Sequence, residues 1–120
     1  MKPVSEEIQY MSIVSLESTY TKLLHAHQST VAKGSSTTRI AKRLRAVKIG
    51  LDSVKEMWRG ERFEYDEAGI LASKQMLKSI LPSIEQQIAK AKQGSPQKTL
   101  NEHRLTALQL AIESLKSRLH

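Results

Sequence analysis

The chain has 120 residues, with 19 Lys and Arg against 12 Asp and Glu, which gives a formal net charge of +7. This length predicts one domain over residues 1–120 with enough chain for a core, and the basic balance favours an anionic partner without selecting one. The chain has no cysteine, which excludes disulfides, thiolate catalysis and cysteine-based metal sites.

The first predicted helix begins after Ser5, a good N-cap residue, and runs to about Lys33, where Gly34 can end it. Its apolar residues form two stripes that face different ways. The main stripe consists of Ile13, Leu16, Tyr20, Leu23, Leu24, His27 and Val31. The second stripe consists of Val4, Ile8 and Met11. Because a straight helix cannot turn both stripes into one core, either the helix bends near residues 11–12, so that the second stripe caps the bundle end, or that stripe contacts a second copy or a partner.

The second predicted helix, over residues 38–58, is the most regular amphipathic stretch and also the most basic one. Its apolar stripe consists of Ile40, Leu44, Val47, Leu51, Val54 and Trp58. Gly50 lies inside the helix at a cost of about 1 kcal/mol relative to Ala, which indicates a close helix crossing. The bases outside the stripe are Arg39, Lys42, Arg43, Arg45 and Lys48. They are interpreted first as a solvated face, then as an anion or nucleic-acid surface, and last as a membrane-contacting surface.

An aromatic cluster follows the second helix, which Gly60 is expected to end. Its apolar and basic members are Trp58, Arg59, Arg62, Phe63 and Tyr65. Since Trp58 continues the core stripe, the first interpretation is a hydrophobic plug that closes one end of the bundle. The alternative is an exposed interaction loop, because aromatic residues and Arg are the residue types of binding hot spots.

The third predicted helix starts at the N-cap Asp66 and contains Pro82. The apolar stripe keeps its phase across Pro82, so we expect one helix that is kinked near residues 78–81 instead of two helices. The fourth helix begins either at Ser95 with Pro96 in the first helical position, or at the capping box that starts with Thr99.

These four amphipathic segments predict an all-α fold, an up-down-up-down four-helix bundle with the third helix kinked at Pro82. No run of alternating β-branched residues suggests a strand. The residues expected to be almost fully buried are Leu44, Leu51, Leu81, Ile84 and Ile112.

The sequence contains no pattern typical of catalysis or of metal binding. His25 and His27 point about 200° apart on a helix, and no Glu-x-x-His or His-Glu-x-x-His motif is present. We therefore expect no enzyme activity, no catalytic residue, no metal, no cofactor and no small-molecule substrate.

Two functions remain as hypotheses. The first is a small non-enzymatic interaction protein that binds a protein partner or forms a homodimer. The second is a nucleic-acid-associated protein that uses the basic second helix. No stretch approaches the ~20 apolar residues of a membrane span and the first residues lack a signal-like apolar run, so we expect a cytoplasmic protein without a membrane partner.

Overall fold

The computed structural model describes residues 1–119, which contain four helices and no strand. The helices are α1 (Glu6–Ala32), α2 (Thr38–Arg59), α3 (Glu67–Lys90) and α4 (Pro96–Lys116). The all-α class expected from the sequence is confirmed, and α3 continues through Pro82 as one helix.

The helix boundaries lie at the residues whose side chains or backbones suit a helix end. The side chains of Ser5, Asp66 and Ser95 each accept a hydrogen bond from the backbone N–H three residues later, at 3.2, 2.7 and 3.2 Å. These bonds satisfy N–H groups that the first turn leaves without a partner. Gly34 and Gly60 adopt the left-handed conformation, with φ of 73° and 69°, which explains glycine at both positions. The capping box at Thr99 is not used, because α4 begins at Pro96.

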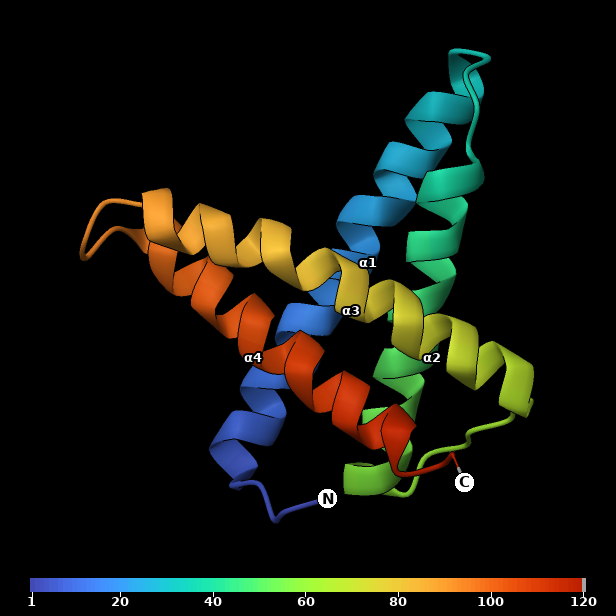
Figure 1. Ribbon diagram of the computed structural model, residues 1–120, viewed down its shortest axis with the longest axis vertical. Coiled ribbons are helices and arrows are strands. Elements are labelled where there is room, and N and C mark those ends of the chain that lie inside the picture. The colour runs from blue at the N-terminus through green and yellow to red at the C-terminus, as the bar shows by residue number, and fades with distance from the viewer. Residues whose placement is uncertain (120) are drawn as a thin grey trace.

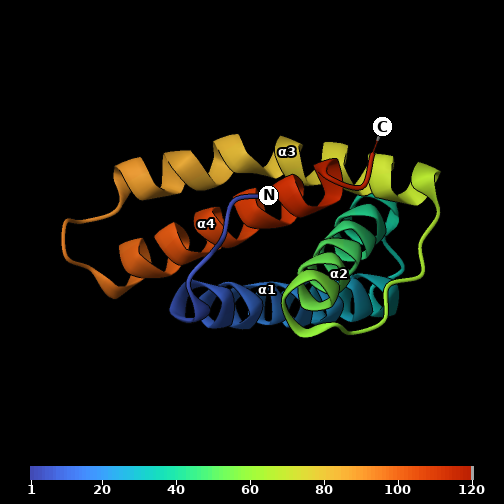
Figure 2. The same ribbon diagram turned by 90° about the horizontal axis from the view of Figure 1, so that it is seen from below.

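The four helices form two antiparallel hairpins that cross each other (Figure 1). The α1–α2 hairpin forms one layer and the α3–α4 hairpin forms the other (Figure 2). The molecule measures 38 × 37 × 21 Å, and its short dimension corresponds to two helix layers of about 10–12 Å each. Each helix contacts the next in the chain and α4 returns to α1, which is the neighbour pattern that an up-down-up-down order requires.

The core lies where the two hairpins cross. Its buried apolar residues are Ile13, Leu16, Ala46, Val47, Ile49, Leu51, Val54, Ile70, Leu77, Ile84, Ala107, Leu108, Ala111, Ile112 and Leu115. Gly50 lies at the closest approach, since a Cβ there would be 3.0 Å from Leu77 Cδ1 and 3.2 Å from Ala111 Cβ. The predicted close crossing at Gly50 is therefore confirmed, and it involves two neighbouring helices.

Some residues expected in the core lie outside it. Leu44 and Leu81 are only half-buried, and Val31 is 56% exposed. Val31 lies in the last turn of α1, close to the α1–α2 connection, and Leu44 lies on α2 two residues before the buried Ala46. Leu81 lines a shallow open pocket at the edge of the α3–α4 interface. The expectation of near-complete burial is wrong for Leu44 and Leu81 and correct for Leu51, Ile84 and Ile112, and Val31 of the main stripe lies outside the core.

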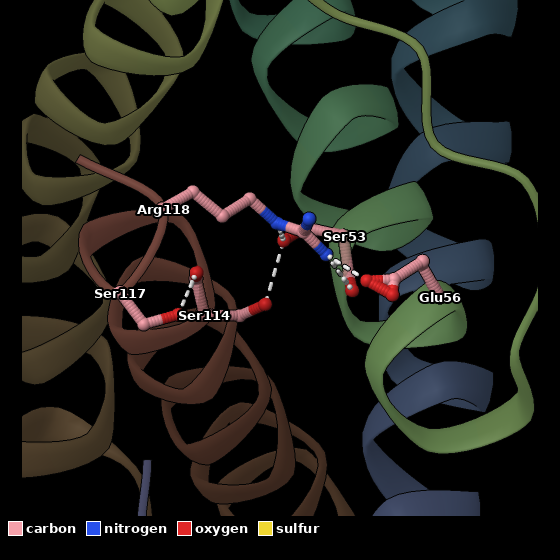
Figure 3. Close-up of polar contacts among 5 residues, drawn as sticks. All are labelled: Ser53, Glu56, Ser114, Ser117 and Arg118. Atoms are coloured by element: carbon pink, nitrogen blue, oxygen red, sulfur yellow. Dashed lines mark hydrogen bonds and ion pairs between the residues drawn. The ribbon is translucent and has the colours of Figure 1, made fainter.

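A network of hydrogen bonds joins the C-terminal end of α4 to α2 (Figure 3). This network, called the clasp below, consists of Ser53, Glu56, Ser114, Ser117 and Arg118. The buried hydroxyl oxygens of Ser53 and Ser114 lie 2.6 Å apart. Arg118 donates from Nε to the Ser53 hydroxyl at 2.7 Å and from Nη2 to the Ser53 carbonyl and to Glu56, both at 3.0 Å. The Ser117 hydroxyl donates to the carbonyl of Ser114 at 2.7 Å. Because these bonds pair the polar groups of the α2–α4 contact, they offset the cost of burying them.

Candidate anion-binding site

The basic residues of α2 do not form one patch. Arg39 is exposed at the start of the helix. Lys48 forms an ion pair with Asp52 at 3.1 Å, one helical turn later. Lys42 and Arg45 line a cleft against α3, whereas Arg43 lines a second cleft to which all four helices contribute. The basic surface expected from the sequence is therefore divided between two separate depressions.

The second depression, the four-helix cleft, has a volume of about 220 Å³. Its lining residues are Thr19, Lys22 and Leu23 of α1, Arg43 of α2, Ile80, Ser83, Ile84 and Gln87 of α3, and Arg104 and Leu108 of α4. Apolar side chains and polar side chains thus line one small space. Such a combination is typical of sites that bind a small group and orient it with a few polar contacts.

Three cations and no carboxylate line this cleft. Lys22, Arg43 and Arg104 come from three different helices. None of the three forms an ion pair with an acidic residue of the described part of the chain. Because like charges in one partly enclosed space repel each other, this arrangement favours a bound anion that neutralises them.

Arg104 is the most unusual of these cations. Its Nε is buried and, among residues 1–119, has no hydrogen-bond partner. Burial lowers the pKa of Arg104 below its usual value, yet a guanidinium remains protonated in proteins. A buried N–H group without an acceptor is costly, whereas an anion bound to the guanidinium would supply the missing acceptor.

The first depression, the α2–α3 cleft, is wider and holds about 400 Å³. Its lining residues are Lys42, Arg45, Ala46, Ala72, Ser73, Gln75, Met76 and Ser79. It also combines two cations with neutral polar side chains and a small apolar surface. No carboxylate is among its lining residues.

The aromatic cluster packs against the molecule. Trp58, Phe63 and Tyr65 are half-buried and contact the core. Phe63 lies under the Arg118 guanidinium, 3.9 Å from its ring centroid, and the Tyr65 hydroxyl donates to Asp52 at 2.6 Å. Burial and this hydrogen bond raise the pKa of Tyr65 to about 12. The aromatic side chains therefore pack against the core, as the hydrophobic-plug interpretation expects.

The two arginines of this cluster lie at the surface. Arg59 and Arg62 expose 44% and 84% of their side chains, and each forms an ion pair with a nearby glutamate. Exposed pairs of this kind contribute little to stability. The surface of the connector is therefore polar and charged.

The second apolar stripe, Val4, Ile8 and Met11, lies at the N-terminal end of α1 and in the residues just before it. Val4 and Met11 are half-buried, while Ile8 is 37% exposed. Neighbouring Tyr10 and Val14 are 67% and 45% exposed. This end of α1 therefore keeps apolar surface at the exterior.

Sequence reasoning identified Arg43 but missed Lys22, Arg104 and the polar side chains of α3. One signal was available, because Arg104 lies four residues before Leu108 and so on the apolar stripe of the fourth helix. A cation in that position either extends its charged group away from the core or lines a binding site. The contribution of Lys22 could not be deduced, since it depends on how the hairpins cross.

No family model, curated protein or solved structure matches this chain. Within residues 1–119, no three His, Asp or Glu side chains lie close enough together to hold a metal ion. None of the described helices combines the length and the apolar character needed to cross a bilayer.

Proposed function

We propose that this protein is a non-enzymatic, cytoplasmic interaction protein that holds an anionic group of a protein partner in the four-helix cleft. The observation that carries the proposal is the buried Nε of Arg104, which has no acceptor among the described residues. Lys22 and Arg43 add positive charge around it, and Ser83 adds a hydroxyl donor. A carboxylate or phosphate would receive charge-assisted hydrogen bonds there.

The test uses inorganic phosphate as the probe and Arg104→Met as the variant. Because a ligand that binds only the folded state stabilises it, phosphate should raise the melting temperature of the wild type. It should also shift the NMR signal of the Arg104 Nε–H group. Arg104→Met keeps an aliphatic side chain and removes the charge, so its melting temperature should not respond to phosphate.

The matched control is Arg39→Met, which removes the same charge from an exposed position outside the cleft. This variant should respond to phosphate as the wild type does. An equal response of all three proteins would contradict the proposal, because binding would then be a general effect of net charge.

A nucleic-acid partner is the second candidate. Hydroxyl and amide side chains beside cations, such as Thr19, Ser83 and Gln87, are typical of phosphate contacts. Duplex binding would then weaken with salt, with a log–log slope of about −0.9 per neutralised phosphate. Replacing Arg39, Lys42 and Arg43 with Ala should reduce that slope, and an absence of binding at low salt would remove this candidate.

We also propose that the free protein forms a weak homodimer through Val4, Ile8 and Met11. The exposed part of Ile8 and the half-buried positions of Val4 and Met11 leave apolar surface on this face, which supports the proposal. Sedimentation should show a concentration-dependent dimer in the wild type and a monomer in Ile8→Asp, with unchanged helicity. A wild type that remains monomeric at high concentration would contradict it.

Finally, we propose that α3 is kinked near Pro82. Proline lacks the N–H that would bond to the carbonyl of Lys78 and its ring crowds that carbonyl, which bends a helix. Pro82→Ala should therefore straighten α3, which NMR measurements of helix orientation would detect.

A further inference from the structure

The four-helix cleft and the α2–α3 cleft are neighbours. On α2, the consecutive residues Lys42 and Arg43 line one cleft each. On α3, Ser79 belongs to the α2–α3 cleft and the next residue, Ile80, to the four-helix cleft. Because their α3 residues run from 72 to 79 and from 80 to 87, the two depressions follow one another in a line along α3.

One wall of this line is a regular polar row on α3. Gln75 and Ser79 line the α2–α3 cleft, and Ser83 and Gln87 line the four-helix cleft. These residues are four positions apart, so successive members are about 6 Å apart along the axis and turned by about 40°, and the row spans about 18 Å while turning by about 120° around the helix. Gln side chains both donate and accept hydrogen bonds.

The remaining lining of this line, the cationic wall, comes from α1 and α2 opposite α3 and from α4 beside α3. Lys42 and Arg45 contribute to the α2–α3 cleft, and Lys22, Arg43 and Arg104 to the four-helix cleft. The lining residues of the two clefts include five cations and no carboxylate. A ligand that fills both clefts must therefore carry negative charge at more than one point.

We propose that both clefts bind one extended segment of a partner protein, with acidic residues at alternate positions, an inference that rests on the function proposed above. An extended peptide rises about 3.3 Å per residue, so side chains on one face recur about every 6.6 Å. This repeat fits the interval of the polar row on α3. About six residues would span the row, with their carboxylates toward the cationic wall and their backbone amides toward Gln75 and Gln87.

A nucleic acid fits this line less well. A single strand is usually held by aromatic side chains that stack on its bases, and neither cleft has an aromatic lining residue. The apolar side chains Leu23, Ile80 and Met76 suit a peptide, which has apolar atoms between its charges.

The test measures fluorescence anisotropy with two labelled peptide isomers of about eight residues, long enough to span the row. One isomer alternates Glu and Ser, and the other has the same glutamates in one block. The alternating isomer should bind about tenfold more tightly, which corresponds to one added charge-assisted contact. The variant Lys42→Ala with Arg45→Ala should lower its affinity by about tenfold, toward that of the block isomer.

The control variant is Lys33→Ala with Lys116→Ala, which removes two exposed charges that line neither cleft. It should change the affinity less than about twofold, as expected for distant surface charges. Equal binding of the two isomers would overturn the extended-segment proposal, as would equal effects of the two double variants. The proposed function would nevertheless stand if phosphate still bound through Arg104.

Two further outcomes are decisive. If oligothymidylate displaces the alternating peptide and binds more tightly, the occupant is a nucleic acid and the peptide proposal is overturned. If neither the peptide nor phosphate depends on Arg104, the proposed function fails together with this inference. Melting curves of every variant show whether a lost affinity reflects the site or a loss of folding.

Discussion

Ser53 and Ser114 face each other across the α2–α4 contact with their hydroxyl oxygens 2.6 Å apart, and neither residue is exposed to solvent. Arg118, just beyond α4, completes this pair by donating to the Ser53 hydroxyl. Two small polar residues therefore pack inside the core because an arginine near the end of the chain closes their hydrogen-bond network.

Arg118→Ala should lower the free energy of unfolding by about 1.5–3 kcal/mol, because it removes charge-assisted hydrogen bonds to Ser53 and Glu56. Arg118→Lys should recover only part of the loss, since an ammonium group cannot reproduce the guanidinium fork. Urea denaturation measures both. Arg62→Ala, which removes a largely exposed arginine, is the control and should change stability by less than about 0.5 kcal/mol. A loss at Arg118 no larger than this would mean that the clasp is not a stabilising element.

Leu51→Ala should cost about 2–5 kcal/mol, because Leu51 is buried at the crossing and the change leaves a cavity. Leu44→Ala makes the same chemical change in the same helix, but at a position that is only half-buried. Its cost should stay below about 2 kcal/mol, since much of the side chain is already in contact with water. Urea melts that rank the two variants in the opposite order would place the core elsewhere along α2.

Gly50→Leu should destabilise the protein by about 1–3 kcal/mol or more, because the new side chain would meet Leu77 and Ala111. Gly50→Ala should have a smaller effect, since its gain in helix propensity of about 1 kcal/mol opposes the crowding. Ala89→Leu, on the exposed face of α3, is the matched enlargement and should change stability by less than about 0.5 kcal/mol. Thermal unfolding compares the three variants, and tolerance of leucine at Gly50 would rule out the close crossing.

Stability should depend on Tyr65 at alkaline pH. Burial and the hydrogen bond to Asp52 raise the pKa of Tyr65 from 10.0 to about 12, so the folded state favours the neutral phenol. Between pH 10 and about 12 the unfolded chain releases this proton and the folded chain retains it. The stabilisation that the raised pKa of Tyr65 contributes is therefore complete below pH 10 and is lost as the pH rises through about 12.

The measurement is the free energy of unfolding against pH for the wild type and for Tyr65→Phe, which lacks the titrating group. The wild type should lose more stability than the variant over this range. Asp52→Asn should bring the pKa of Tyr65 closer to its usual value, because the charged acceptor is gone. Parallel pH profiles for the wild type and Tyr65→Phe would show that the hydrogen bond to Asp52 does not persist in solution.

The sequence by itself determined the local features of this protein. The caps at Ser5 and Asp66 and the left-handed Gly60 depend on residues within one helical turn, so their patterns are visible in the chain, whereas Ser95 was one of two starts that the sequence allowed for α4. The continuity of α3 through Pro82 followed from an apolar stripe that keeps its phase. In each case the physical cause, a side chain meeting the nearby backbone or a repeat matching the helix, acts over a short distance.

Only the tertiary structure decided which apolar residues are buried and where the cations meet. Leu44 and Leu51 occupy the same stripe, yet Leu51 is buried and Leu44 is only half-buried. Lys22, Arg43 and Arg104 share a cleft although they are far apart in the chain, because the crossing of two hairpins brings α1, α2 and α4 to one point. Helical periodicity states which face of a helix is apolar, but the partner helix and the crossing position determine how much of that face becomes core and what lies at its edge.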